Sequence, residues 1–233
     1  MIFGIHQPYF LPYIGYFQLI NAVDLYALAD NYKYIKNGWI NRNRILCNGA
    51  PCYLTIEVHH PSQNRLISEH MIAERADFAL KLVQVRDFYR KAPHLEEGMS
   101  LLEEIFNCDE RNLSAFLARS IRLTCDYLGI TTKIISSAEI AQDPSLKREE
   151  RLYDYCRKLN ADQYLNAIGG MEIYHFDEFK AHGIELGFLS SIPVPYDQGL
   201  PEFVENLSIL DAIMFNDKEN LQKMLDSYRI IRE

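Results

Sequence analysis

The chain has 233 residues, of which 48% are hydrophobic and 24% are charged, and this composition is ordinary for one globular domain spanning residues 1–233. The formal net charge of −8 argues against a general nucleic-acid binder, and no apolar run approaches the ~20 residues that a membrane span needs. The N-terminus shows no secretory signal, and the five cysteines are odd in number and scattered. We therefore expect a reduced, cytoplasmic protein without a membrane span.

The first 30 residues predict a strand, a loop, a helix and a second strand. Residues 2–5 are a short apolar strand, and two prolines keep the following loop extended until a helix begins near Tyr13. Residues 25–29 form the second apolar strand. His6 and Asp30 then stand at the carboxyl ends of neighbouring strands, which is the edge where open α/β sheets bind ligands.

Residues 33–44 concentrate positive charge in an acidic protein. The segment surrounds the only tryptophan, Trp39, with Lys33, Lys36, Arg42 and Arg44. The planar guanidinium group of arginine matches phosphate and carboxylate geometry. In an extended segment, Arg42 and Arg44 share one face and Asn41 and Asn43 share the other. The segment predicts a site for an anionic ligand, and structural ion pairs with the many acids are the alternative.

The rest of the chain alternates between predicted strands and helices. The predicted strands cover residues 53–58, 66–71, 131–136, 162–166 and 184–189. The predicted helices cover residues 76–91, 96–106, 113–128 and 174–182, with another starting at Asp143-Pro144 or Ser145 and a last one entering residues 210–214. This alternation favours an α/β fold with a largely parallel, Rossmann-like sheet, in which residues 76–128 are a helical insertion or cap.

The chemistry available at the predicted sheet edge begins with His6. A histidine has a pKa suited to acid–base catalysis near neutrality, and Asp30 can orient it. The alternative is that His6 only hydrogen-bonds a backbone carbonyl beside Pro8. No metal-ligand spacing, Walker loop or dinucleotide fingerprint occurs, so we expect no metal and the sequence identifies no cofactor. Gly169-Gly170, at the end of a predicted strand, is weak evidence for a phosphate site.

Three stretches resemble the WbqC-like family of bacterial proteins: HQPYFLPYIGYFQLI, KNGWINRNRI and NLSILDAIMFN. The resemblance spans almost the whole chain. That family is associated with polysaccharide and O-antigen gene clusters, and transfer of a small acyl or glycyl group has been suggested for it. The resemblance implies a transferase that acts on an amino sugar or nucleotide sugar. Lys33 stands where the family usually has a glutamine, so the substrate here can differ.

The family pattern and the loop near the last helix give the predicted substrate-binding residues. They are Gln7, Tyr9, Gly15, Tyr16, Lys36, Trp39, Asn41, Arg42, Asn43, Arg44, Gln198, Ser208 and Asp211. In this interpretation His6 is the general base, and Asp30 orients it.

The first strand–loop–helix unit also resembles the HIGH-motif nucleotidylyltransferases. Tyr13 and Tyr16 occupy the two histidine places of that motif, and tyrosine has no positive charge at pH 7. This second likeness implies nucleotide or phosphate binding rather than adenylyl transfer.

Three interpretations are therefore open. The first is a transferase with an anionic small-molecule substrate, which is a nucleotide, a nucleotide sugar or an activated acyl donor. The second is an enzyme related to nucleotidylyltransferases, and the third is a non-catalytic binding or assembly protein that uses the surface around Trp39. An enzyme requires His6, Asp30 and the arginines to converge on one cleft. The sequence does not determine the oligomeric state.

Overall fold

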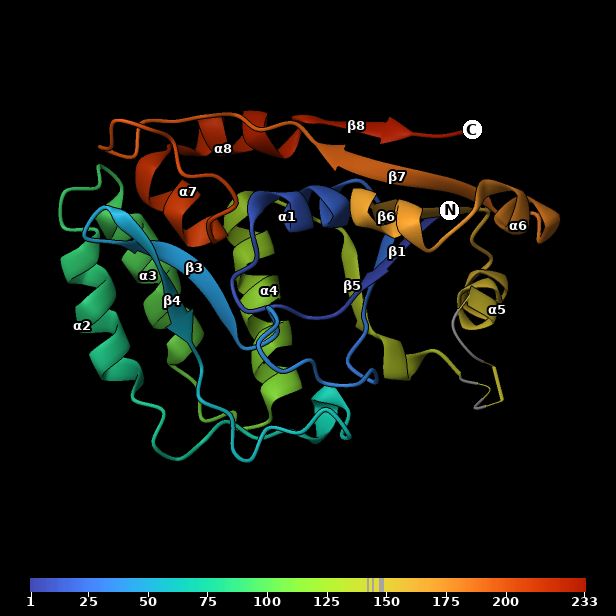
Figure 1. The fold of residues 1–233 in the computed structure, drawn as a ribbon, viewed down its shortest axis with the longest axis horizontal. Coiled ribbons are helices and arrows are strands. Elements are labelled where there is room, and N and C mark those ends of the chain that lie inside the picture. Colours follow the sequence, from blue (N-terminus) through green and yellow to red (C-terminus); the bar gives the residue numbers. More distant parts are fainter. Residues whose placement is uncertain (142, 144, 147–148) are drawn as a thin grey trace.

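The computed structural model describes residues 1–233 except 142, 144 and 147–148 (Figure 1). In this part of the chain the central sheet contains β1 (Ile2–His6), β2 (Leu25–Leu28), β5 (Lys133–Ser136), β6 (Gln163–Ala167), β7 (Glu185–Ser191) and β8 (Tyr228–Ile231). A separate hairpin contains β3 (Arg42–Cys47) and β4 (Ala50–Thr55). The helices are α1 (Ile14–Asn21), α2 (Phe78–Phe88), α3 (Leu95–Phe106), α4 (Leu113–Leu128), α5 (Glu149–Leu159), α6 (Phe176–Ala181), α7 (Ile209–Phe215) and α8 (Lys218–Leu225).

The central sheet has the strand order β5-β2-β1-β6-β7-β8, and all neighbouring strands are parallel except β7 and β8. The chain moves outward from β1 through β2 to β5, and then returns to the other side of β1 to form β6. This is the Rossmann order, and it confirms the predicted α/β fold with a largely parallel sheet. The direction of winding reverses between β1 and β6.

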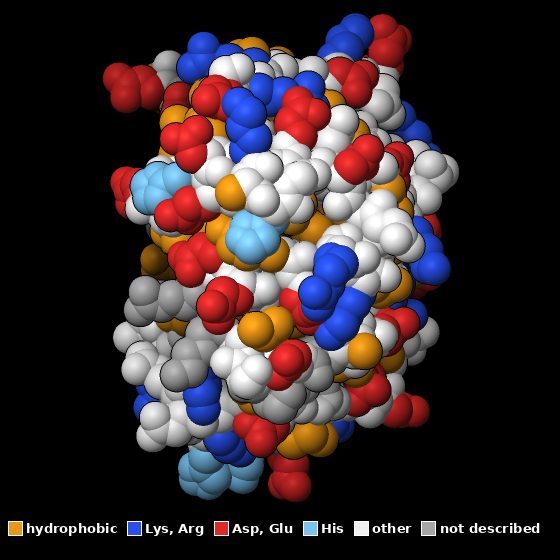
Figure 2. All heavy atoms as spheres, turned by 90° about the vertical axis from the view of Figure 1, so that its right-hand side faces the viewer, with side chains coloured by type: hydrophobic (Ala, Val, Ile, Leu, Met, Phe, Trp, Pro, Cys, Tyr) orange, Lys and Arg blue, Asp and Glu red, His pale blue; other side chains and the backbone are white. Residues whose placement is uncertain are grey.

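The two faces of the sheet are covered by different helices. Side chains alternate between the faces along a strand, so Phe3 and Ile5 pack with α5 and α6, whereas Tyr26 and Leu28 belong to the core on the opposite face. Figure 1 shows α1 and α4 to the left of the sheet and α5 and α6 to its right. Acidic and basic side chains are interspersed over the face on the α5 and α6 side (Figure 2).

The helices of residues 76–128 lie between β4 and β5 in the chain. α3 packs against α2, α4 and α7, and these helices share a continuous apolar core with α1 and α8. The predicted ends of α4 are confirmed: the Asn112 side chain accepts a hydrogen bond from the Ala115 amide (3.1 Å), and Gly129 ends the helix at φ 74°. Only a residue without a side chain adopts that conformation at little cost.

Two predicted strands differ from the structure. The strand expected at residues 53–58 is β4, which starts earlier, because Asn48 and Gly49 form a tight turn with φ values of 52° and 80°. Asparagine followed by glycine favours such turns, and this signal was available in the sequence. The strand expected at residues 66–71 is wrong: the segment forms a short 3-10 helix, Ile67–Glu69, flanked by isolated bridges.

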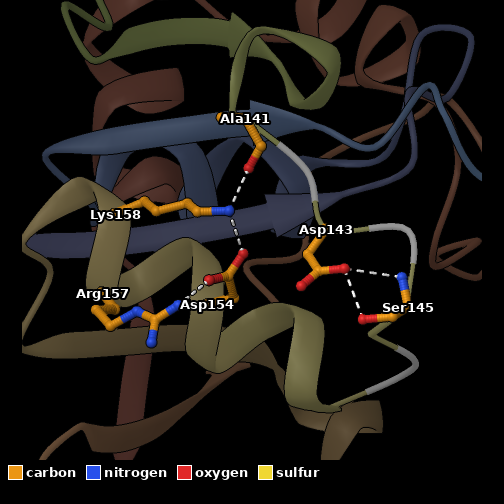
Figure 3. Close-up of polar contacts among 6 residues, drawn as sticks. All are labelled: Ala141, Asp143, Ser145, Asp154, Arg157 and Lys158. Atoms are coloured by element: carbon orange, nitrogen blue, oxygen red, sulfur yellow. Dashed lines mark hydrogen bonds and ion pairs between the residues drawn. The ribbon is translucent and has the colours of Figure 1, made fainter.

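The strand predicted at residues 184–189 is β7, but the sequence interpretation missed α8 and β8 and placed the start of α5 too early. β8 follows β7 and pairs with it antiparallel, and α8 precedes β8. α5 is described from Glu149, whereas Asp143 Oδ1 accepts hydrogen bonds from the Ser145 amide (2.9 Å) and hydroxyl (2.6 Å) in a local turn (Figure 3). Pro144, the other predicted start, lies outside the described residues. In the described part of the chain, no helix has the length and apolarity to cross a lipid bilayer.

Candidate functional site

A cleft of about 450 Å³ opens where β1 and β6 end. It lies where the winding of the sheet reverses, which is the usual position of a ligand site in an open α/β fold. We call it the β1–β6 cleft. Its lining residues are Ile5, His6, Gln7, Tyr9, Ala29, Tyr32, Leu152, Tyr164, Asn166, Ala167, Gly169, Gly170, Ile173 and Tyr174.

His6 is the last residue of β1 and lines this cleft. Its Nδ1 lies 3.2 Å from the Gln7 carbonyl oxygen. A carbonyl only accepts, so Nδ1 carries the hydrogen and Nε2 keeps its lone pair. Burial lowers the pKa of His6, and the hydrogen bond to Gln7 offsets part of that shift. His6 is therefore neutral at pH 7, the form that can accept a proton.

Asp30 lies at the predicted edge but has other partners. β1 and β2 are parallel with His6 opposite Leu28, so Asp30 follows at the same edge, as predicted. Its carboxylate accepts hydrogen bonds from the hydroxyls of Ser136 (2.8 Å) and Ser114 (3.0 Å). Among the described residues no hydrogen bond joins it to His6. Asp30 therefore links β2 to β5 and α4, and the interpretation that it orients His6 has no support in these contacts.

Arg42 is held by backbone carbonyls and an aromatic ring. Its Nε donates to the Gly38 carbonyl (3.2 Å), Nη2 donates to the Asn37 carbonyl, and the guanidinium lies 4.3 Å from the centre of the Tyr53 ring. No described acidic side chain forms an ion pair with it. The alternative interpretation of Arg42 as half of a structural ion pair is therefore not found in the described part of the chain.

Arg44 lies beside a second hollow of about 190 Å³. Its Nη2 donates to the Asn206 carbonyl (3.1 Å), and its guanidinium lies 5.9 Å from the centre of the Trp39 ring. The hollow is lined by Tyr9, Pro12, Tyr13, Trp39, Asn43, Arg44 and Asn206. Tyr9 also lines the β1–β6 cleft, so the two hollows are neighbours with one shared wall.

Asn43 and Ser208 fix the loop of residues 7–13, which contributes side chains to both hollows. Asn43 Nδ2 donates to the carbonyls of Phe10 (3.2 Å) and Leu11 (2.9 Å), and the Ser208 hydroxyl donates to the same Leu11 oxygen (2.8 Å). Leu11 has a φ of 41°, a strained value for a side chain of its size. Both polar residues are buried and position the loop, and of the two only Asn43 also lines the second hollow.

Asp211 and Gln198, two predicted substrate-binding residues, are also buried and hydrogen-bond to other residues of the protein. Asp211 is 0% exposed and accepts hydrogen bonds from the Tyr89 hydroxyl (2.8 Å), the Tyr196 hydroxyl (2.7 Å) and Gln198 Nε2 (2.8 Å). Burial raises the pKa of Asp211, and the three donors counteract that rise. This cluster joins α7 to the end of α2 and to the loop before α7.

Four more predicted residues lie outside both hollows. Tyr16 is buried and its hydroxyl donates to the Gln7 carbonyl (3.0 Å). A Cβ on Gly15 would lie 2.4 Å from the Tyr13 ring, so a close approach explains that glycine. Asn41 bonds the Tyr34 hydroxyl and the Ile56 carbonyl (2.7 Å each), and Lys36 is exposed. These contacts support structural roles for Gly15, Tyr16 and Asn41.

Sequence reasoning missed four polar residues of the β1–β6 cleft: Tyr32, Tyr164, Asn166 and Tyr174. Asn166 is near the carboxyl end of β6, and open α/β sheets bind ligands at the carboxyl ends of their strands. The reasoning that identified His6 would therefore have identified Asn166 once β6 was known to pair with β1. Gly170 lies against it, because a Cβ there would come within 2.8 Å of Asn166 Nδ2. In the described residues no group of three or more His, Cys, Asp or Glu is placed to hold a metal, and the metal-free state stays a prediction.

The contacts of Arg42 lead to a specific expectation. We expect Arg42→Ala to lower the free energy of unfolding by only about 1 kcal/mol, because it removes bonds to exposed carbonyls and leaves no described buried acid unpaired. Arg42→Lys should be intermediate, since it keeps the charge and loses the planar contact with Tyr53. Chemical denaturation of both variants measures this. A loss of about 3–5 kcal/mol for Arg42→Ala would instead indicate a buried ion pair.

The sequence matches the WbqC-like protein family over residues 7–223. It is similar to the uncharacterized protein Rv1507c of Mycobacterium tuberculosis, with 30% identity over 167 residues that cover 70% of this chain and 71% of that protein. No solved structure gives a significant match. The family match covers almost the whole chain, including the loop of residues 7–13 and the hairpin that build the two hollows: the chain belongs to the WbqC-like protein family.

Proposed function

We propose that this protein is a transferase of bacterial polysaccharide biosynthesis that binds a nucleotide, nucleotide sugar or activated acyl donor in the β1–β6 cleft. The main support is the position of that cleft at the reversal point of a Rossmann-ordered sheet, with a neutral histidine in its wall. Its volume is in the range of small-molecule sites. The association of WbqC-like proteins with polysaccharide gene clusters supports the substrate class and a place in the cytoplasm.

The proposed reaction moves a small acyl or aminoacyl group to the amine of an amino sugar. His6 Nε2 takes a proton from the attacking amine as the new amide bond forms, and the bond between the acyl group and its carrier breaks. The leaving group departs with the bonding electron pair. Gln7 holds the His6 ring through its carbonyl, so Nε2 is the nitrogen available as base.

The second hollow gives this reaction room for a second substrate. Trp39 is 39% exposed there, and an exposed indole ring is a suitable surface for stacking a sugar. Arg44 supplies a positive charge at the same place. Because Tyr9 lines both hollows, a donor in one and an acceptor in the other would meet beside it.

A thermal-shift screen tests the substrate class. Nucleotides, nucleotide sugars and acyl donors are added separately to the protein, and a true ligand at 100 times its Kd should stabilise it by roughly 2.7 kcal/mol. Donor–acceptor pairs built from the hits are then assayed for product by mass spectrometry. Absence of stabilisation by every class would contradict the proposal.

The role of His6 predicts a large effect on turnover. We expect His6→Gln to reduce the rate by about 10²–10⁴-fold with unchanged donor binding, since glutamine cannot take the proton. In the wild type, the rate should fall on the acid side, with a midpoint below the ordinary histidine pKa, because burial lowers the pKa of His6. Tyr53→Phe, outside both hollows, is the matched control. A wild-type rate for His6→Gln would exclude this mechanism.

The nucleotidylyltransferase-like alternative is favoured by the same strand order and cleft. Against it, the Tyr16 hydroxyl is engaged by the Gln7 carbonyl, so one of the two motif positions is not free to hold a phosphate. That enzyme would release pyrophosphate from a nucleoside triphosphate, which the product assay detects. The non-catalytic alternative is favoured by the exposed Trp39 and Tyr53, and predicts ligand binding that His6→Gln leaves intact, with no product.

A further inference from the structure

The β1–β6 cleft has no cation among its lining residues in the described part of the chain. An anionic substrate needs positive charge or several hydrogen-bond donors, and the neutral His6 supplies no charge. Arg42 and Arg44 do not line this cleft, and Arg44 belongs to the second hollow. The proposed substrate therefore lacks the partner that the sequence analysis assigned to it.

Arg151 lies at the border of this cleft. It is in the first turn of α5, and the next residue, Leu152, lines the cleft. Its guanidinium lies 5.4 Å from the centre of the ring of Tyr32, which also lines the cleft. Arg151 Nε is buried and has no hydrogen-bond partner among the described residues. A buried guanidinium nitrogen without an acceptor is costly, which makes it an indication of a missing ligand.

The other cations of α5 near this position are paired. Figure 3 shows Asp154 accepting from both Arg157 and Lys158, and Lys158 also donates to the Ala141 carbonyl (2.7 Å). The buried carboxylate of Asp154 thus has two cations one turn further along the helix. Arg151 has no such acid in the described part of the chain.

We propose that Arg151 binds the phosphate of a nucleoside diphosphate group of the substrate in the β1–β6 cleft. The inference rests on the proposed function and names the charged partner of that same site. The planar guanidinium offers two parallel N–H donors to phosphate oxygens, and Tyr32 supports it from one side. Gly169, which lines the same cleft, has open space where a side chain would be, so a phosphate can approach its backbone closely.

The test measures binding of uridine, UDP and ADP by calorimetry to four proteins. They are the wild type, Arg151→Gln, Arg151→Lys and Arg157→Gln. Arg157→Gln is the matched control, since it makes the same change on the same helix at an exposed residue whose acid keeps Lys158. We expect Arg151→Gln to weaken diphosphate binding by about ten- to a hundredfold and to leave the binding of uridine unchanged. Arg151→Lys should be intermediate, and Arg157→Gln should match the wild type.

Each outcome bears on the inference. Equal affinity of Arg151→Gln and the wild type for the diphosphate overturns it and leaves the proposed function standing. Absence of diphosphate binding by the wild type also overturns it, and the thermal-shift screen with acyl donors then decides whether the proposed function stands. If Arg151→Gln fails to fold, the affinity of Arg151→Lys for the diphosphate tests the inference. Lysine keeps the positive charge, which preserves folding, but it lacks the two parallel N–H donors of the guanidinium group and so binds a phosphate less tightly. Wild-type affinity of that variant would then overturn the inference.

Discussion

Asp211→Ala is expected to lower the free energy of unfolding by about 2–4 kcal/mol. The change leaves the buried hydroxyls of Tyr89 and Tyr196 without their acceptor, at roughly 1–3 kcal/mol each. The substitution also removes a carboxylate whose ionised form is disfavoured by burial, which raises the pKa of Asp211. Removing that cost offsets part of the loss. Denaturant unfolding measures the difference.

Asp211→Asn is the matched control for that experiment. Asparagine keeps the volume, its oxygen can accept from Tyr196 and Gln198, and its amide can donate to the Tyr89 hydroxyl. We expect a loss below about 1.5 kcal/mol. A folded Asp211→Ala protein as stable as the wild type would show that this cluster does not hold α7 in place.

The two Asp211 proteins should also differ in their pH dependence. The folded state of the wild type binds the Asp211 proton more tightly than the unfolded state, because burial raises the pKa. The resulting stabilisation is complete below the ordinary aspartate pKa and is lost as the pH rises through the folded pKa. Asparagine does not titrate, so the wild type should lose stability relative to Asp211→Asn over that window.

Asn43→Asp is expected to destabilise the protein by about 3 kcal/mol or more at pH 7. The substitution preserves shape but replaces the amide donor with a carboxylate oxygen that faces the carbonyl oxygens of Phe10 and Leu11. The loop of residues 7–13 should loosen, so ligand binding in both hollows should weaken as well. Thermal unfolding and the ligand titration measure the two effects.

The Asn43 site also has an internal control. Asn43→Ala removes the donor without adding a charge, so its loss should be smaller, at about 2 kcal/mol. Lowering the pH protonates the new aspartate, which can then donate to Leu11, and stability should return towards the wild-type value. Equal stability of Asn43→Asp and Asn43→Ala at pH 7 would contradict the repulsion between the carboxylate and the carbonyls.

Much of the fold was predictable because its signals are local. The proline-bounded loop sets the start of α1, and Asn112 and Gly129 cap the two ends of α4. Each of these signals acts within a few residues of the chain. The prediction that His6 and Asp30 lie at the same edge of the sheet is confirmed, because the parallel strands β1 and β2 have their carboxyl ends side by side. β8 was missed because a four-residue edge strand has too few side chains to show a period.

The candidate site was predictable only in part. His6, Gln7 and Tyr9 line the β1–β6 cleft, and Trp39 and Arg44 line the hollow beside it. The sequence could not separate these residues from Asp211 and Ser208, which the same family pattern contains. Burial decided between them, and burial depends on which helices cover a residue.

The sequence by itself determined the types of the elements and the chemistry at the first strand end, because hydrophobic period and capping act between near neighbours. Only the tertiary structure decided which polar groups meet. The Ser136 hydroxyl is 106 residues from Asp30, and the Tyr89 hydroxyl is 122 residues from Asp211. Pairing across such separations depends on strand order and helix packing, which bring together side chains that no local pattern connects. The same packing placed Arg151 beside the cleft, against the Tyr32 ring, with its Nε buried and without an acceptor among the described residues.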